Sequence, residues 1–218
     1  MRRRFDEQLN DLNDALMAMA NQVQNAIQKA IGALLKQDIA LAQKVMDGDK
    51  EVDRQQKQIE NMCFTLLMQQ QPVASDLRTI SGALRMVTDM ERIGDHAADI
   101  SEITIMLANQ PYIKNLEHIS KMASETMYML ISGMEAFMDK DMEKAQKVIA
   151  HDDIVDNLFA EAKQELIELI HKDKNNGEQA ADLLMVAKYF ERIGDHATNI
   201  AEHILFSLEN RPSNESGV

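Results

Sequence analysis

A seven-residue segment, ERIGDHA, occurs twice in the sequence, at residues 91–97 and again, unchanged, at residues 191–197. The two copies lie one hundred positions apart in a chain of 218 residues. Identical segments at such a spacing indicate an internal duplication, in which each copy belongs to one structural unit. We therefore expect two copies of one unit, and any fold assigned to the first half must also suit the second.

Composition and periodicity favour helices in both units. The chain has only 3 prolines, 8 glycines and 4% aromatic residues, whereas good helix formers such as Ala, Leu, Met, Glu, Gln and Lys are abundant. Apolar residues recur three or four positions apart over residues 5–36, which is the spacing of a long amphipathic helix. The same spacing returns along most of the chain.

Turn and capping residues divide the periodic pattern into six expected helices. In the first half these are residues 5–36, a helix capped by Asp38 and stopped at Pro72, and a helix capped by Ser75 that ends near Pro111. In the second half we expect helices over residues 112–138, after Asp141 in the place of Asp38, and after a turn at Asn176 and Gly177.

Long helices with short connections pack antiparallel, so the sequence predicts an all-α fold of two tandem three-helix bundles. The predicted domains are residues 1–110 and 111–210, followed by a polar tail over residues 211–218. The segment AQKV at residues 42–45 returns at 145–148, an offset of 103. The three-residue difference from the ERIGDHA offset fits a shorter connection before the last helix.

Charge restricts the partners that this chain can bind. The formal net charge is −13, from 23 basic and 36 acidic residues, which argues against nucleic acid or an anionic membrane as partners. No apolar run is long enough to cross a bilayer, and no secretory signal follows the three N-terminal arginines. The single cysteine, Cys63, fits a reducing compartment and a place in the core. We expect a cytoplasmic protein whose partners are basic surfaces or metal cations.

The repeated motif carries a row of carboxylates. On a helix, Glu91, Asp95 and Asp99 fall on one face at i, i+4 and i+8, and no Lys or Arg is interleaved with them. Each like-charged pair at this spacing costs about 0.2–0.5 kcal/mol. The second copy keeps Glu191 and Asp195 but has Asn199 in place of the third acid, so its row is weaker.

A second pair of acids accompanies each row. Asp49 and Asp53 in the first half match Asp152 and Asp156 in the second, and all four motifs read [DE]xxxD. Two such pairs on neighbouring helices form a plausible shallow, solvent-open cation site on each bundle. Acidic pairs at i, i+4 are also common on solvated helix faces, and that interpretation stays open.

Other residues of the motif have several possible roles. His96 and His196 could pack and support the site through hydrogen bonds, bind a metal directly, or accept a phosphoryl group. Arg92 and Arg192 lie off the acidic row and could form salt bridges with other helices.

Two glycines and one further histidine also stand out. Gly94 and Gly194 occupy mid-helix positions, which indicates a close helix approach or a crowded site. His151 has no histidine in the matching place of the first half, and we treat it as incidental.

The doubled ERIGDHA, the segment QQPVASDLR at residues 70–78 and the DxxxD pairs together resemble the PhoU family of phosphate-uptake regulators. This resemblance spans residues 5 to about 209. It implies one multinuclear metal cluster per bundle, of iron or zinc, with manganese or magnesium as alternatives. The ligands it implies are Asp49, Asp53, Glu91, Asp95 and Asp99 in the first bundle, and Asp152, Asp156, Glu191 and Asp195 in the second.

The resemblance also implies a function. Members act in the cytoplasm as negative regulators of phosphate uptake and of the phosphate-starvation response. They bridge the ATPase subunit of a phosphate ABC transporter to a sensor histidine kinase, and many are homodimers. We accordingly expect no catalytic activity, no nucleic-acid binding and no membrane insertion.

Two rival interpretations remain. A di-iron carboxylate enzyme or iron store needs a pair of Glu-x-x-His motifs, and this chain offers one such spacing, from Glu168 to His171, without a repeat partner. A helical adaptor whose acidic rows bind nothing is the other. Oxygen consumption with ferrous iron tests the first, and metal analysis tests the second.

Overall fold

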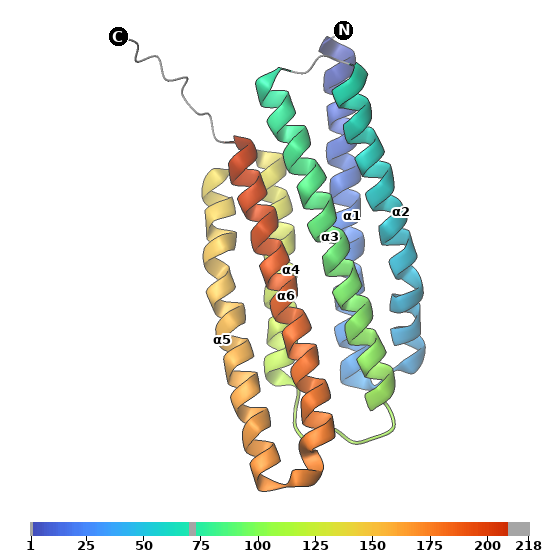
Figure 1. The fold of residues 1–218 in the computed structure, drawn as a ribbon, viewed down its shortest axis with the longest axis vertical. Helices are drawn as coiled ribbons and strands as arrows, with labels where there is room; N and C mark the ends of the chain where they lie inside the picture. The colour runs from blue at the N-terminus through green and yellow to red at the C-terminus, as the bar shows by residue number, and fades with distance from the viewer. Residues whose placement is uncertain (1, 70–72, 209–218) are drawn as a thin grey trace, which may run out of the picture.

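The computed structural model describes residues 2–69 and 73–208. These residues form six long α-helices and one short 3-10 helix, with no strand in the described ranges. The elements are α1 (Arg2–Lys36), α2 (Ile39–Gln69), α3 (Ala74–Leu107), α4 (Glu117–Asp139), α5 (Met142–Lys172), η1 (Lys174–Asn176) and α6 (Gly177–Leu208). The expected all-α fold of two tandem three-helix bundles is confirmed (Figure 1).

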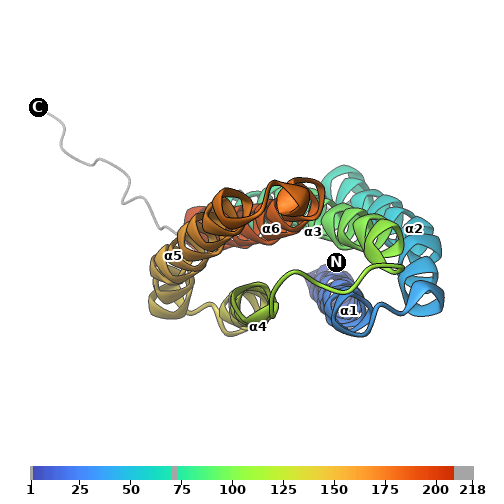
Figure 2. The ribbon, with the colours of Figure 1, turned by 90° about the horizontal axis from the view of Figure 1, so that it is seen from below.

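The two bundles lie side by side and share an extensive contact. Helices α3 and α6 lie next to each other in the middle of one layer, with α2 and α5 at its outer edges, and α1 and α4 form a second layer (Figure 2). The α3–α6 contact joins the bundles, and α1 packs on α4 across the same boundary. Both copies of ERIGDHA therefore lie on the helices at the centre of the molecule.

The apolar stripes meet in a closed core. Ile93, Ala97 and Ile100 of α3 are buried, as are their repeat counterparts on α6, and so is Cys63, which confirms its predicted place in the core. Burying each Leu or Ile side chain stabilises the folded state by about 1.5–3 kcal/mol, so the apolar stripes supply most of the free energy that favours bundle formation. None of the described helices is long and apolar enough to cross a membrane.

The duplication is visible in the turns between the first two helices of each bundle. Gln37 and Lys140 both adopt left-handed conformations, with φ of 52° and 54°. The next residues are the predicted caps: Asp38 accepts a hydrogen bond from the Leu41 N–H at 2.9 Å and Asp141 accepts one from the Lys144 N–H at 3.0 Å. Both capping predictions are confirmed. The equivalent turn residues of the α1–α2 and α4–α5 hairpins are 103 positions apart, which is the offset of the AQKV segments.

The predicted start of α3 is wrong. Val73 is the N-cap of α3, and its N–H donates to the Asp76 carboxylate at 3.2 Å. Ser75 already lies within the first helical turn, so it is not the cap. The predicted stop at Pro72 and the tail over residues 211–218 lie outside the described residues.

The predicted start of α4 at residue 112 is also wrong, because α4 begins at Glu117. The Tyr112 hydroxyl donates to the Leu34 carbonyl at 2.6 Å, and the Ile113 N–H donates to Gln179 Oε1 at 2.6 Å. These bonds hold the segment against α1 and α6 in a non-helical path. At the α5–α6 turn, Gly177 begins α6 and the turn itself is the 3-10 helix η1.

Candidate metal centres

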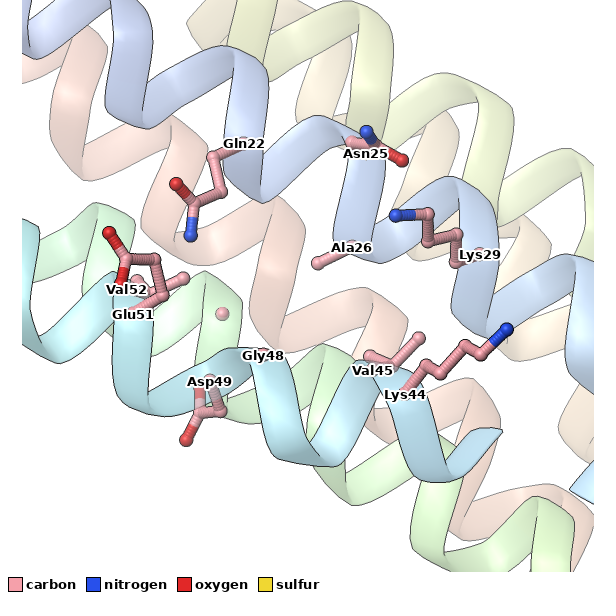
Figure 3. A pocket seen from close by; sticks show the side chains of 11 residues that line it. Gln22, Asn25, Ala26, Lys29, Lys44, Val45, Gly48, Asp49, Glu51 and Val52 are labelled. Atoms are coloured by element: carbon pink, nitrogen blue, oxygen red, sulfur yellow. The ribbon is translucent and has the colours of Figure 1, made fainter. Parts of the chain in front are cut away.

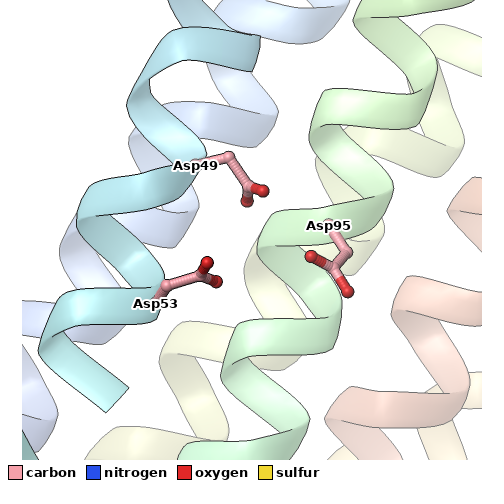
Figure 4. Close-up of side chains that lie close together, drawn as sticks. All are labelled: Asp49, Asp53 and Asp95. Atoms are coloured by element: carbon pink, nitrogen blue, oxygen red, sulfur yellow. The ribbon is translucent and has the colours of Figure 1, made fainter. Parts of the chain in front are cut away.

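Helices α2 and α3 bring three of the predicted ligands together in the first bundle. Asp49 and Asp53 project from α2 toward Asp95 on α3 (Figure 4), and one carboxylate oxygen from each lies within 4.8 Å of the others. Glu91 and Asp99, also predicted ligands, fall outside this group of three. The arrangement offers a cation three hard oxygen donors from two helices.

The glycines of the repeated motif allow the two helices to approach. A Cβ on Gly94 would lie 3.1 Å from Val52 Cγ1 and 3.6 Å from Asp49 Oδ1. In the second bundle, a Cβ on Gly194 would lie 3.0 Å from Asp152 Oδ1. The predicted close helix approach is confirmed, and in both bundles the glycine lies directly beneath the first carboxylate of the acidic pair.

The first site concentrates negative charge, and its strongest effect is at Asp49. Burial first, and then the neighbouring charges of Asp95 and Asp53, together raise the pKa of Asp49 from 3.8 to about 6. Asp49 Oδ1 is buried and has no hydrogen-bond partner among the described residues. A buried acceptor left unpaired costs about 1–3 kcal/mol. A proton or a cation would remove that cost, so these residues fit a bound metal.

Arg92 partly neutralises the row. Its Nη1 donates to Asp95 Oδ2 at 2.8 Å, and its Nε lies 3.4 Å from Glu91 Oε2. The expectation that Arg92 pairs with another helix is therefore wrong, because its long side chain folds back along α3. Burial, then the charge of Asp95, still raises the pKa of Glu91 despite Arg92. Arg192 forms no ion pair within the described part of the chain.

The second bundle repeats the site in a more open form. Burial, followed by the charges of Asp156 and Asp195, raises the pKa of Asp152 to about 6. Asp156 and Asp195 are exposed, whereas Asp53 and Asp95 are half-buried. Glu191 keeps one buried oxygen without a hydrogen-bond partner in the described structure, and Lys188 binds the other.

A polar cluster around Asp89 lies where the two bundles meet, and sequence reasoning missed it. Asp89 Oδ1 lies 2.8 Å from His196 Nδ1 and accepts a hydrogen bond from Asn199 Nδ2 at 3.2 Å, while Asp89 Oδ2 lies 3.1 Å from His203 Nε2. Burial alone would raise the pKa of Asp89, but these hydrogen bonds outweigh it and lower the pKa to about 2. The residue in the matching place is Tyr189, so a search for repeated acids could not find Asp89.

The motif histidines face this boundary. The rings of His96 and His196 are 5.6 Å apart, and His96 lies 5.4 Å from the Tyr189 ring. Asp99 Oδ2 lies 3.3 Å from His96 Nδ1, and Asn199 binds Asp89. Of the three roles considered, packing and hydrogen-bonded support fit this geometry best.

Comparison with known proteins assigns the family. The PhoU domain family model matches residues 16–104 and 119–204. The "Phosphate-specific transport system accessory protein PhoU homolog" of Clostridium acetobutylicum is 34% identical over 211 residues, 96% of either chain. The homologue of the same name from Aquifex aeolicus is 37% identical over 186 residues, 85% of this chain and 84% of its own.

Solved structures agree with the sequence comparison. The crystal structure of PhoU from Pseudomonas aeruginosa superposes with a TM-score of 0.89 at 30% identity, covering 93% of this chain and 98% of its own. The phosphate transport system regulatory protein PhoU from Streptococcus pneumoniae gives a TM-score of 0.86 at 26% identity, covering 93% and 96%. Fold, repeats and sequence thus agree, and the chain belongs to the PhoU family.

Proposed function

We propose that this chain is a cytoplasmic negative regulator of phosphate uptake and of the phosphate-starvation response. The observation that carries the proposal is the match over both repeats to relatives named as phosphate-specific transport accessory proteins. In this role the chain bridges a phosphate ABC transporter, through its ATPase subunit, to a sensor histidine kinase. It acts by binding and not by catalysis, and it works as a homodimer.

Each bundle is proposed to hold a multinuclear iron or zinc cluster. Asp49, Asp53 and Asp95 would hold it in the first bundle, supported by Glu91 and Asp99. Asp152, Asp156, Glu191 and Asp195 would hold it in the second. The metal would supply positive charge, which relieves repulsion among the carboxylates and links α2 to α3 and α5 to α6. Stiffened helix pairs would then present a fixed docking surface.

Partner binding tests this mechanism in vitro. Binding of the native and the metal-stripped chain to the ATPase subunit and to the kinase is measured by biolayer interferometry over a range of salt concentrations. Because the chain carries a net charge of −13, binding to basic patches should weaken as salt rises. If stripping the metal leaves both affinities unchanged, the structural role of the metal is wrong. Salt-insensitive binding would argue against electrostatic docking.

A reporter assay tests the regulatory role itself. Deletion of the gene should switch on a phosphate-starvation promoter in phosphate-rich medium, and the native chain should restore repression. The variant with Asp95→Ala and Asp195→Ala should accumulate normally yet fail to restore it. A deletion strain that remains repressed in rich medium would refute negative regulation.

A further inference from the structure

A cavity of about 290 Å³ lies between α1 and α2 of the first bundle (Figure 3). Gln22, Asn25 and Lys29 line it from α1, and Lys44 and Gly48 line it from α2. Figure 3 shows Asp49, on the same turn of α2, pointing away from α1. Asp49 is therefore shared by the cavity and the candidate metal centre, but its carboxylate points away from the α1 side of the cavity.

Gly48 keeps this cavity open. A Cβ built on Gly48 would meet nothing within 4 Å, in contrast to Gly94. Glycine within a helix is less favourable than alanine, and neighbouring atoms give no steric reason for it at this position. Its effect is to leave free a volume that a side chain would fill.

The second bundle shows what fills the equivalent volume. At the offset of 103, His151 stands in the place of Gly48, with Glu125 in the place of Gln22 and Tyr128 in the place of Asn25. His151 Nε2 lies 2.6 Å from Glu125 Oε2, and its ring lies 4.7 Å from the Tyr128 ring. A planar imidazole with one hydrogen bond and one ring contact therefore stands in the second bundle where the first has Gly48. His151 is thus not incidental, as the sequence suggested, but fills this copy of the cavity.

The charged residues that surround the cavity in the first bundle also differ from those at the equivalent place in the second. Lys29 is replaced by Ser132, and the counterpart of Lys44 is Lys147, which forms an ion pair with Glu143 at 2.8 Å. Position 40, which matches Glu143, is alanine, and neither Lys29 nor Lys44 has an ion-pair partner among the described residues. Two ammonium groups without an ion-pair partner in the described ranges therefore line the first cavity.

The remaining lining residues offer an apolar surface for the nonpolar part of an organic ligand. The other cavity residues are mostly small and apolar: Ala26, Val45, Val52 and Gly94. Two carboxylates also line the cavity. Asp49 points away from α1, and Glu51 accepts a hydrogen bond from Arg54 at 2.6 Å and is partly neutralised. The cavity thus combines an apolar floor with a cationic end.

We propose that the cavity binds a small phosphate-bearing compound with a planar ring. The ring occupies the space that Gly48 leaves and His151 fills in the second bundle, and the phosphate lies at Lys29 and Lys44. Lysine ammonium groups bind phosphate through charge-assisted hydrogen bonds. The inference does not rest on the proposed regulatory function, since it uses only the cavity and its altered copy.

Calorimetric titration of the full chain with AMP tests the proposal, because AMP carries both a planar ring and a phosphate. Adenosine and ribose 5-phosphate supply each half alone. We expect one AMP to bind per chain, and each half to bind at least about tenfold more weakly because one set of contacts is missing.

Variants taken from the duplication provide matched controls. The triple variant Gln22→Glu, Asn25→Tyr and Gly48→His copies the second bundle and should abolish AMP binding. Lys44→Ala should weaken binding about tenfold by removing one charge-assisted contact, whereas Lys147→Ala should leave it unchanged. Circular dichroism melts verify that each variant is folded.

Three results would overturn the proposal. They are no AMP binding to the native chain, undiminished binding to a folded triple variant, or equal losses from Lys44→Ala and Lys147→Ala. Ribose 5-phosphate binding as tightly as AMP would overturn the assignment of the ring. Binding that follows the expected order would establish a ligand site in the first bundle only.

Discussion

The two bundles share one framework but differ in the exposure of their acidic sites and in the polar residues at their boundary. Both place a glycine of ERIGDHA beneath the first acid of the facing helix, at Gly94 and at Gly194. Yet the first bundle gathers three half-buried aspartates, whereas the exposed acids of the second leave a more open site. Duplication therefore preserves the backbone contacts that define the fold and the acidic pairs, while the exposure of those acids diverges.

The same contrast holds at the boundary between the bundles. Position 89 is an aspartate that binds His196 and His203, and the matching position 189 is a tyrosine that contacts the ring of His96. Position 99 is an acid beside a histidine, and position 199 is an amide that donates to Asp89. The boundary is asymmetric although the helices that form it are copies.

The largest stability effect is expected at Asp89. Asp89→Ala leaves His196, His203 and Asn199 without their acceptor, and we expect a loss of about 3 kcal/mol from the free energy of unfolding. Asp89→Asn keeps part of the hydrogen bonding and should lose about half as much. Urea denaturation of the metal-free chain measures both. An Asp89→Ala variant as stable as the native chain would show that the cluster does not join the bundles.

The next largest effects on stability are expected at two glycines, Gly94 and Gly48. Gly94→Val places methyl groups against Val52 and should destabilise the chain by about 2 kcal/mol through overpacking. Gly48→Ala enters open space and should stabilise it by up to about 1 kcal/mol. Thermal melts of the two variants measure the difference. If both shift stability in the same direction, the close contact at Gly94 is not what distinguishes the two positions.

The raised pKa values at the acidic sites predict that the stability of the metal-free chain depends on pH. Burial and the neighbouring carboxylates together raise the pKa of Asp49 to about 6, so the folded metal-free chain binds more protons between pH 4 and 6 than the unfolded one. The favourable contribution of protonated Asp49 is complete below about pH 4 and is lost as pH rises through 6, by about 1 kcal/mol after allowance for partial exposure.

Comparison with charge-neutral variants isolates this effect. Between pH 4 and 6, the stability of the metal-free native chain should fall relative to Asp49→Asn and, separately, relative to Asp152→Asn, whose carboxyl pKa is likewise raised to about 6. Chemical denaturation across this range measures it. Parallel curves for native and variant would contradict the raised pKa values.

The smallest effect on stability is expected at positions 99 and 199, where the first repeat has Asp and the second has Asn. Asn199→Asp brings a second carboxylate to Asp89, where the amide now lies 3.2 Å away, and should cost about 1 kcal/mol near neutral pH. Asp99→Asn should cost less, because Asp99 is partly exposed and loses one contact to His96. Equal costs would mean that the asymmetry of the boundary has no energetic basis.

Much of this architecture could be predicted because periodicity and repeat offsets are local properties of the sequence. The six helices, the caps at Asp38 and Asp141 and the glycine contacts follow from spacing. The start of α4 does not, since long-range hydrogen bonds from Tyr112 and Ile113 override helical propensity. The Arg92 side chain lies along its own helix, and residue spacing does not specify this side-chain conformation.

The boundary between the bundles was also beyond sequence reasoning. Asp89 occurs in only one repeat, and its partners lie more than one hundred positions away. His151 contacts Glu125 and Tyr128 across two helices, whereas Gly48 at the matching position leaves open space. In both cases the informative feature is a difference between the repeats, which identity between the repeats does not reveal.

Metal content of repeat-specific variants tests the central claim most directly. The native chain, Asp95→Ala, Asp195→Ala and the double variant are purified without chelator, and metal per chain is determined by mass spectrometry. We expect several iron or zinc ions in the native chain, a larger loss from Asp95→Ala than from Asp195→Ala, and none in the double variant. A metal-free native chain, or a double variant that retains the native content, would show that the duplicated acidic pairs are not metal centres.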